Sequence, residues 1–291
     1  MAICTLRRPQ IEDALRSLVH QTMPEQGRMR VCVIDNDQDD RRRAEIMAMG
    51  ADRGLDLDYV HAPRFNISLA RNAALDACAT RWLAFMDDDE IALPDWLANL
   101  LARRHGHQAV FGIARAIYPE TGVPRWIAGE DFHSNTMDRQ DPPWKGYTCN
   151  VLIDMDFVQA HGLRFKEEMG QIGGEDTLFF RDMYKAGGQL AYAPGAIVEE
   201  PTPLSRMTLG WLIKRRFRSG QVHFIVLRQE GKTIKGSALA VAKAGLFLLL
   251  ATLNLPRPSK AARHVLRAAL HMGVFASALG FAPYREYSAP A

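Results

Sequence analysis

The sequence predicts an α/β fold with a mostly parallel central sheet, flanking helices and a basic helical C-terminal extension. Short apolar segments alternate with amphipathic segments from residue 2 to about residue 118, as in a parallel sheet crossed by helices. Acidic side chains follow two of these apolar segments, at the sheet edge where such folds bind ligands. From Pro201 onward, fourteen Lys and Arg stand against two acidic residues, which predicts a separate basic region.

The expected strands are short apolar runs bounded by polar residues. They cover residues 2–5, 29–34, 58–61, 82–86 and 109–114. All five runs have the length of strands rather than of helices, and they contain mainly aliphatic or aromatic residues.

Amphipathic segments between these strands are expected to be helices, at residues 11–21, 40–51, 68–78 and 94–104. Ser68 could cap the third helix, because its hydroxyl can accept a hydrogen bond from a free backbone N–H group. Proline is favoured in the first turn of a helix, and Pro94 stands at the start of the fourth.

Several classes of protein are excluded by what the sequence lacks. No Gly-x-Gly-x-x-Gly pattern follows the first strand and no Walker-type loop is present, which argues against a dinucleotide site or a P-loop. The four cysteines are widely spaced, without a Cys-x-x-Cys pair, so we expect reduced thiols rather than disulfides or a zinc site. No signal peptide precedes the first strand, and we expect a cytoplasmic protein.

Four consecutive acidic residues follow the fourth expected strand: Asp87, Asp88, Asp89 and Glu90. Side chains alternate along an extended chain, so Asp87 and Asp89 share one face. Like charges this close repel unless a cation lies between them, and carboxylate oxygens suit Mg²⁺ or Mn²⁺. The alternative is a solvated turn in which Asp89 or Glu90 caps the next helix.

A second acidic pair, Glu175 and Asp176, follows Gly173 and Gly174 and precedes an amphipathic segment. This pattern puts both acids at the start of a helix. A carboxylate on a glycine-containing loop can serve an enzyme as a general base. Acids at a helix start also stabilise the helix without any chemical role, so both interpretations stay open.

A basic segment at 211–221 contains Arg215, Arg216 and Arg218. Guanidinium groups match phosphate oxygens in pairs, so these residues could hold a diphosphate leaving group. The alternative is the solvated basic face of a helix.

The C-terminal region combines an apolar run at 238–255, interrupted by Lys243, with a helix expected at about 260–279. The uninterrupted apolar part is too short to span a bilayer comfortably. In the second helix Arg263, Arg267 and His271 recur four residues apart on one face. This pattern is typical of a helix lying on an anionic membrane surface, and we expect that partner and no nucleic acid. The alternative is a helical hairpin packed on the main domain.

Four motifs in order resemble those of the family 2 glycosyltransferases, in particular the bacterial exopolysaccharide branch with its succinoglycan-type sugar transferases. They are Ala-Arg-Asn at 70–72, Asp-Asp-Asp-Glu at 87–90, Pro-Asp-Trp-Leu at 94–97 and Gly-Glu-Asp at 174–176. The resemblance covers residues 2–221. It implies the GT-A nucleotide-sugar-binding fold and a metal-dependent, inverting hexosyltransferase with Mg²⁺ or Mn²⁺ as cofactor.

The same resemblance implies a nucleotide-sugar donor, such as UDP-glucose or another UDP-hexose, and a saccharide acceptor carried on a lipid at the inner face of the cell membrane. The Gln-x-x-Arg-Trp signature of processive synthases is absent, so we expect transfer of a single sugar. The sequence after the first strand reads Cys-Thr-Leu-Arg-Arg-Pro at 4–9, where family members often have Pro-Thr-Tyr-Asn.

Carried over by position, the resemblance also implies roles for single residues. Thr5 and Asp37, or Asp35 in place of Asp37, would contact the nucleoside, Arg71 the diphosphate, and Asp88 the ribose or donor sugar. Asp89 would bind the metal with help from Asp87. Asp176 would be the catalytic base, with Glu175 as the second candidate, and Tyr147 and Asn150 would border the acceptor.

We therefore expect a glycosyltransferase domain over residues 1–221 and a membrane-associated helical region over 222–291. One alternative is a sugar-1-phosphate nucleotidylyltransferase. That enzyme would need a Gly-rich, Arg-containing loop after the first strand, and this sequence lacks such a loop. The other is a non-catalytic carbohydrate-binding or membrane-binding module, which would leave the two acidic motifs without a purpose.

Overall fold

The computed structural model describes residues 1–24, 27–127, 130–138 and 141–285. Within them the chain forms two compact units. The sheet unit comprises Met1–Ala116 and Ser134–Pro201, and the helical unit comprises Ile117–His133 and Thr202–Arg285. The domain boundary expected at residue 221 falls inside helix α7, Leu209–Gln229.

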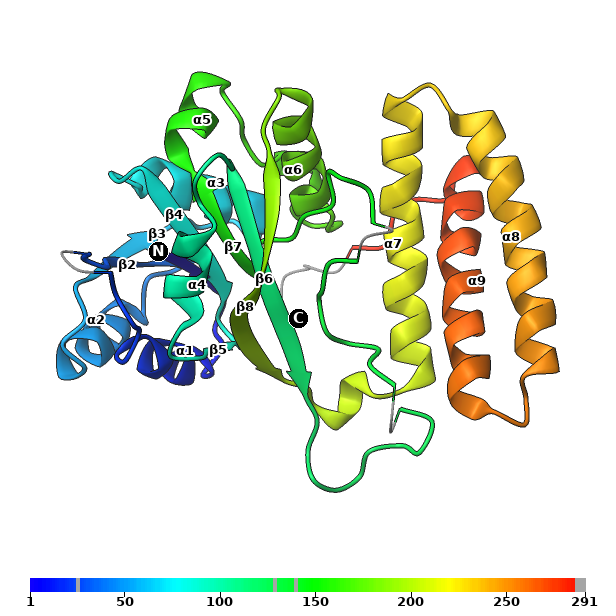
Figure 1. The fold of residues 1–291 in the computed structure, drawn as a ribbon, viewed down its shortest axis with the longest axis horizontal. Helices are drawn as coiled ribbons and strands as arrows, with labels where there is room; N and C mark the ends of the chain where they lie inside the picture. The colour runs from blue at the N-terminus through cyan, green and yellow to red at the C-terminus, as the bar shows by residue number, and fades with distance from the viewer. Residues whose placement is uncertain (25–26, 128–129, 139–140, 286–291) are drawn as a thin grey trace. The chain divides into compact units, whose positions relative to one another are not determined.

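The described residues of the sheet unit form one eight-stranded sheet in the order β3-β2-β1-β4-β7-β6-β8-β5 (Figure 1). The strands are β1 Ala2–Thr5, β2 Val31–Asp35, β3 Leu57–His61, β4 Trp82–Asp87, β5 Ile91–Ala92, β6 Ala109–Ile117, β7 Asn150–Asp154 and β8 Leu190–Pro201. Strands β3, β2, β1 and β4 are parallel, which confirms the α/β prediction for this half. The other half contains antiparallel pairs, β4 with β7, β6 with β7 and β5 with β8, so the sheet as a whole is mixed.

The strand register brings the polar strand ends to one edge. Thr5 at the end of β1 pairs with Asp35 at the end of β2, and Cys4 pairs with Asp87 at the end of β4. The carboxyl ends of parallel strands are where open α/β sheets bind ligands. The acidic residues predicted from the sequence therefore lie at this edge.

Six helices of the described sheet unit flank the sheet (Figure 1). They are α1 Ile11–Leu18, α2 Arg43–Asp52, α3 Ile67–Ala77, α4 Trp96–Ala102, α5 Met155–Ala160 and α6 Glu175–Lys185, with a short 3₁₀ turn at Glu167–Met169. In α1 the buried residues Ile11, Ala14, Leu15 and Leu18 follow helical spacing and form its core-facing stripe.

Helix α3 is capped by Asn66 and not by Ser68. The Asn66 side chain accepts a hydrogen bond from the Leu69 backbone N–H at 3.2 Å. Ser68 lies one residue inside the helix and is fully buried. The prediction of Ser68 as the cap was therefore wrong. The capping residue is Asn66, two positions earlier, whose side-chain oxygen accepts a hydrogen bond from a free N–H group of the first turn.

The helical unit contains three long helices, α7 Leu209–Gln229, α8 Thr233–Leu253 and α9 Pro258–Ala278, with a 3₁₀ turn at Leu204–Arg206. Helix α9 packs against both α7 and α8 (Figure 1). Gly220 and Gly273 lie where α7 and α9 cross: a Cβ atom at Gly220 would stand 1.9 Å from the Leu270 carbonyl oxygen, and one at Gly273 1.9 Å from that of Phe217. The two backbones approach this closely only because both positions are glycine.

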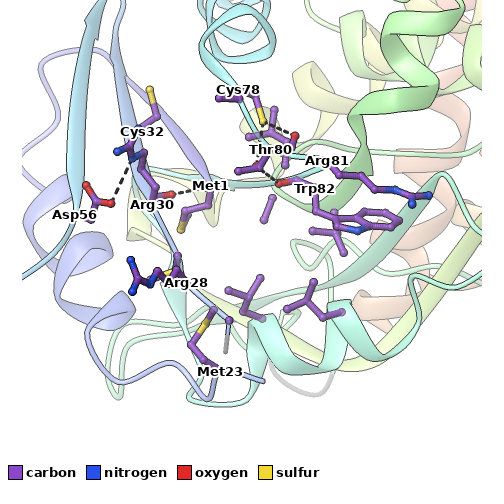
Figure 2. A pocket seen from close by; sticks show the side chains of 18 of the residues that line it. Met1, Met23, Arg28, Arg30, Cys32, Asp56, Cys78, Thr80, Arg81 and Trp82 are labelled. Carbon is purple, nitrogen blue, oxygen red and sulfur yellow. Dashed lines mark hydrogen bonds and ion pairs between the residues drawn. The ribbon is translucent and has the colours of Figure 1, made fainter. Parts of the chain in front are cut away.

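A pocket of about 700 Å³ opens at the amino ends of the parallel strands (Figure 2). Met1, Arg30 and Trp82, next to or at the starts of β1, β2 and β4, line it together with Met23 and Cys78. It lies at the opposite end of these strands from Asp35 and Asp87. This pocket is therefore separate from the edge at which the predicted site residues gather.

Candidate active site

The loop after β1 contacts the acidic turn after β4. The Thr5 hydroxyl donates a hydrogen bond to Asp88 Oδ2 at 2.7 Å. Arg8 Nη1 lies 3.1 Å from Asp88 Oδ1 and 2.6 Å from Asp89 Oδ2. Arg8 therefore neutralises part of the charge of two adjacent carboxylates.

The acidic turn is also closed by its own last residue. The Asp87 backbone N–H donates to Glu90 Oε2 at 2.9 Å, and the Glu90 N–H donates to the Asp87 carbonyl oxygen at 3.3 Å. Burial raises the pKa of Glu90 well above its ordinary value, and Asp87 raises it further. Burial also raises the pKa of Asp88 to about 6, although Arg8 and Thr5 oppose that shift. The four carboxyl groups are thus held close together although burial and mutual repulsion disfavour their charged forms, an arrangement that is common at functional sites.

The end of β2 contributes two further carboxylates, Asp35 and Asp37. Arg7 donates from Nε and Nη2 to the two oxygens of Asp37, at 2.6 and 2.7 Å, and this bond lowers the pKa of Asp37. The Tyr59 hydroxyl donates to Asp35 Oδ2 at 2.7 Å, and the Asp37 N–H donates to Asp35 Oδ1 at 3.0 Å. Asp35 and Asp37 therefore lie at the edge expected for the nucleoside, each already bound to a protein group.

Arg71 on α3 connects the acidic turn to the start of α6. Its guanidinium forms an ion pair with Glu175 and lies 4.0 Å from Asp87 Oδ1. Burial opposes the charge of Arg71, but Glu175, Asp87 and Asp176 raise its pKa, so it stays protonated. The structure thus brings together acidic residues almost ninety positions apart in the sequence.

The glycines before α6 set the positions of the second acidic pair. Gly173 and Gly174 have φ angles of 88° and 85°, in the left-handed region that favours glycine, and α6 begins at Glu175 as predicted. Glu175 is 4% exposed, and its Oε2 atom is buried without a hydrogen-bond partner among the described residues. Burial raises the pKa of Glu175, although Arg71 opposes the shift.

Asp176 is placed differently from Glu175. Its Oδ1 accepts a hydrogen bond from the Thr177 N–H at 2.6 Å, and the residue is partly exposed. The loop before it is held against α3, because the Ile67 N–H donates to the Gly170 carbonyl oxygen at 3.2 Å and Asn66 Nδ2 donates to that of Glu167 at 2.9 Å. Glu175 is engaged by Arg71, whereas Asp176 presents a carboxylate at a fixed position beside it.

The donor set of the acidic turn fits a hard divalent cation. The side chains of Asp87 and Asp89 are 45% and 16% exposed. Among the residues that the structure describes, no group of three or more His, Cys, Asp or Glu side chains is arranged to hold a metal. One or two carboxylates suffice where substrate phosphates complete the coordination, which is how Mg²⁺ is usually bound. A cation on Asp89 would compete there with the Arg8 guanidinium.

The residues expected near the acceptor make contacts within the protein. Asn150 is fully buried: its Oδ1 accepts from Trp96 Nε1 at 2.8 Å, and its Nδ2 donates to two carbonyl oxygens, of Ile113 at 2.9 Å and Ala196 at 3.0 Å. The Tyr147 hydroxyl donates to the Gly112 carbonyl oxygen at 2.5 Å. These contacts join β6, β7 and β8, and an acceptor contact by either side chain stays a prediction.

We expect Asn150→Leu to lower the free energy of unfolding by about 2 kcal/mol or more, because it leaves one indole N–H and two carbonyl groups buried without their partner. Urea denaturation followed by fluorescence would measure the change. The matched control is Gln159→Leu, which replaces an exposed amide and should change stability little. Unchanged stability of Asn150→Leu would contradict the structural role.

The three arginines expected to hold the diphosphate lie on α7 in the helical unit. The Arg215 guanidinium lies 5.5 Å from the centre of the Trp211 ring. Burial, with the positive charges of Arg215 and Arg267, lowers the pKa of Arg216. Binding of the donor diphosphate by Arg215, Arg216 and Arg218 stays a prediction.

Sequence reasoning gave no site role to Arg7, Arg8 or Tyr59, and it did not predict how Glu90 closes the acidic turn. Arg8 pairs with Asp88 and Asp89, and Glu90 closes the acidic turn through a backbone hydrogen bond. The sequence contained a signal for Arg8, since two arginines follow the first strand directly. The sequence identified Glu90 as the fourth member of the acidic run but contained no signal for its hydrogen bond to the Asp87 N–H.

Comparison with known proteins agrees with this geometry. The family model described as Glycosyl transferase family 2 matches residues 2–156. The chain is 43% identical over 300 residues to the succinoglycan biosynthesis protein ExoM of Rhizobium meliloti (strain 1021), across 99% of this chain and 95% of that protein. It is 27% identical over 198 residues to a pre-mycofactocin glycosyltransferase of Mycobacterium tuberculosis, across 63% of this chain and 41% of that one.

Solved structures show the same fold at low sequence identity. The mannosyltransferase PcManGT from Pyrobaculum calidifontis, in complex with GDP-Man and Mn²⁺, superposes with a TM-score of 0.62 at 17% identity, covering 92% of this chain and 84% of that one. Residues 1–349 of S. aureus TarS in complex with UDP-GlcNAc superpose with a TM-score of 0.53 at 15% identity, covering 96% and 91%. The family and fold expected from the motifs are thus confirmed, and the chain belongs to glycosyl transferase family 2, as a glycosyltransferase with the GT-A fold.

Proposed function

We propose that this enzyme transfers one hexose from a nucleotide-sugar donor, a UDP-hexose such as UDP-glucose, to a lipid-linked saccharide in bacterial exopolysaccharide synthesis. The observation that supports it best is Arg71, which contacts Glu175 and lies 4.0 Å from Asp87, so that the two acidic motifs meet at one site. A metal-binding pair and a base beside each other are what an inverting sugar transfer requires.

The similar proteins support the proposed classes of acceptor and donor. The similar protein of Rhizobium meliloti is named for succinoglycan biosynthesis, which supports an exopolysaccharide intermediate as acceptor. The structures of similar fold contain UDP-GlcNAc in one case and GDP-Man with Mn²⁺ in the other, which supports a nucleotide-sugar donor and a divalent metal, Mg²⁺ or Mn²⁺.

In the proposed reaction Asp176 accepts the proton of an acceptor hydroxyl. The oxygen then attacks the anomeric carbon from the side opposite the diphosphate, a new glycosidic bond forms, and the bond from carbon to the diphosphate oxygen breaks. The electron pair leaves with the nucleoside diphosphate, and the configuration at carbon is inverted. When bound, the metal would supply positive charge to the departing diphosphate.

The remaining side chains bind and orient. Asp89 and Asp87 would hold the metal, Asp88 the ribose or sugar, and Thr5 with Asp35 or Asp37 the nucleoside. Arg71 keeps Glu175 in place and adds a buried positive charge beside the leaving group. We assign the reaction to a catalytic region within residues 1–221, in the cytoplasm at the inner face of the cell membrane.

Donor hydrolysis tests this proposal. With Mn²⁺ and UDP-glucose but no acceptor, the purified protein should release UDP slowly, and EDTA should stop the release. Formation of pyrophosphate from a sugar phosphate and a nucleoside triphosphate would instead indicate a nucleotidylyltransferase. Absence of turnover with UDP-, GDP- and TDP-hexoses in the presence of crude lipid-linked acceptor would indicate a binding module and would contradict the proposal.

A further inference from the structure

Helix α8 has an inverted distribution of side chains. Its buried positions are alanines, Ala240, Ala244 and Ala251, whereas most of its large apolar side chains are exposed. The exposed ones on or directly after the helix are Ile234, Leu239, Val241, Leu246, Leu248, Leu249, Leu253 and Leu255, between 45% and 88% exposed. A helix of a protein in water buries its leucines, so this arrangement indicates an apolar environment outside the helix.

The packing within the helical unit is of the same kind. Helices α7 and α9 meet backbone to backbone at Gly220 and Gly273. Small residues at helix contacts, with large apolar residues facing outward, are typical of helices in contact with lipid. Of the helices that the structure describes, α8 is long and apolar enough to cross a membrane.

The charge of this region selects among possible occupants of the apolar face. Residues 231–285 contain eight Lys and Arg and no acidic residue. A second copy of the same unit would bring like charges together, which disfavours pairing through α8. Anionic lipid headgroups are complementary to it, and basic residues near the surface strengthen membrane binding. Lys232, Lys235 and Lys243 on or before α8 and Arg257 after it are exposed.

Contacts between α8 and α9 decide how deep α8 can lie. Phe247, near the middle of the apolar segment, packs on polar residues of α9: its ring lies 5.7 Å from that of His271 and 5.5 Å from the Arg267 guanidinium. Helix α8 has 21 residues and is about 30 Å long, the thickness of a hydrocarbon core. If it spanned the bilayer, Arg267 would lie near the bilayer centre, where a charge is strongly disfavoured.

We propose that α8 binds the protein to an anionic membrane while lying parallel to its surface. The exposed leucines insert among the acyl chains, and the surrounding Lys and Arg contact the headgroups. The inference goes beyond the transfer reaction, because membrane binding through α8 requires no substrate. It also defines which surface would bring the enzyme to a lipid-linked acceptor.

Sedimentation of the full chain with vesicles tests this surface. We expect binding to vesicles of equal parts phosphatidylcholine and phosphatidylglycerol, weaker binding to phosphatidylcholine alone, and partial release in high salt because exposed charges are screened. The triple variant Leu246→Gln, Leu249→Gln and Leu253→Gln should bind the mixed vesicles at least about tenfold more weakly. Its side chains are exposed, so circular dichroism and UDP-glucose hydrolysis in solution should be unchanged.

The matched control replaces exposed apolar residues elsewhere, Val19→Gln with Met47→Gln, and should bind vesicles like the wild type. Equal binding by the α8 triple variant would overturn the proposal. Resistance of the bound protein to an alkaline carbonate wash would show a spanning helix and overturn the surface orientation. A lipid-free dimer that the triple substitution converts to a monomer would assign the face to a second copy instead. Failure of the transfer reaction with vesicle binding intact would affect the proposed function alone.

Discussion

Asp176→Asn should lower sugar transfer by about 10²–10⁴-fold while leaving affinity for the nucleotide-sugar donor nearly unchanged. The substitution keeps the size and the hydrogen-bond acceptor of the side chain but removes its ability to take a proton. Because Asp176 Oδ1 accepts the Thr177 N–H at 2.6 Å, and an amide oxygen can do the same, the start of α6 should stay intact.

The structure favours Asp176 over Glu175 for this role. Glu175 is buried and paired with Arg71, so a proton acceptor there would first have to break that ion pair. Glu175→Gln should therefore hold Arg71 less firmly in place. It should also lower the free energy of unfolding, since it leaves a buried guanidinium without its charge partner.

Single-turnover kinetics with donor and lipid-linked acceptor would measure the loss, and calorimetry would measure donor affinity. Asp182→Asn is the matched control: it lies on the same helix, pairs with Lys166 at 3.0 Å, and should transfer sugar like the wild type. If Glu175→Gln retains its fold but is inactive while Asp176→Asn is active, the roles of the two acids must be exchanged.

The parts of the site that sequence reasoning predicted depend on local signals. A strand followed by Asp87–Asp89, and two glycines followed by Glu175 and Asp176, are each readable within a dozen residues. Their meeting was not readable, because it depends on Arg71, which lies 104 positions from Glu175 and is brought to it by tertiary packing. The resemblance to a family supplied that connection, and the structure gives its physical cause.

In the antiparallel half of the sheet, β6 matches the strand expected at 109–114, but β5, β7 and β8 escaped prediction for a similar reason. Strand β7 begins at Asn150 and β8 at Leu190, after segments without strand-like alternation, and β5 is only two residues long. Its formation depends on non-local partners, such as the pairing of Ile91 with Glu199. The family resemblance suggested Asn150 as an acceptor contact, which stays a prediction, whereas its burial between three strands could not be read from the sequence.

The helical unit shows a different limit. The sequence predicted a basic helical extension at the C-terminus, and α8 and α9 confirm that this region is helical. Which side of α8 is buried could not be predicted, because alanine and leucine are both apolar and give a weak helical pattern. Only packing against α9 distinguishes the alanine side from the leucine side.

Asp89→Ala should reduce metal-dependent donor binding by at least about 10–100-fold, the range seen even when residues behind a metal ligand are changed. In this structure Asp89 is paired with Arg8 at 2.6 Å, so the site holds a protein cation where the metal would bind. The variant removes one carboxylate from the crowded turn, and Arg8 keeps its contact with Asp88 at 3.1 Å. The fold should therefore persist, with thermal stability near that of the wild type.

Calorimetric titration of UDP-glucose with and without Mn²⁺ measures this effect, because a metal ligand is required only in the titration with metal. The control is Asp56→Ala, which removes the same charge at the opposite edge of the sheet, where Asp56 pairs with Arg30 at 3.3 Å. It should leave both titrations unchanged. Undiminished Mn²⁺-dependent affinity in Asp89→Ala would show that this carboxylate does not hold the metal, since a donor diphosphate that binds through the cation must lose affinity with the cation's ligand.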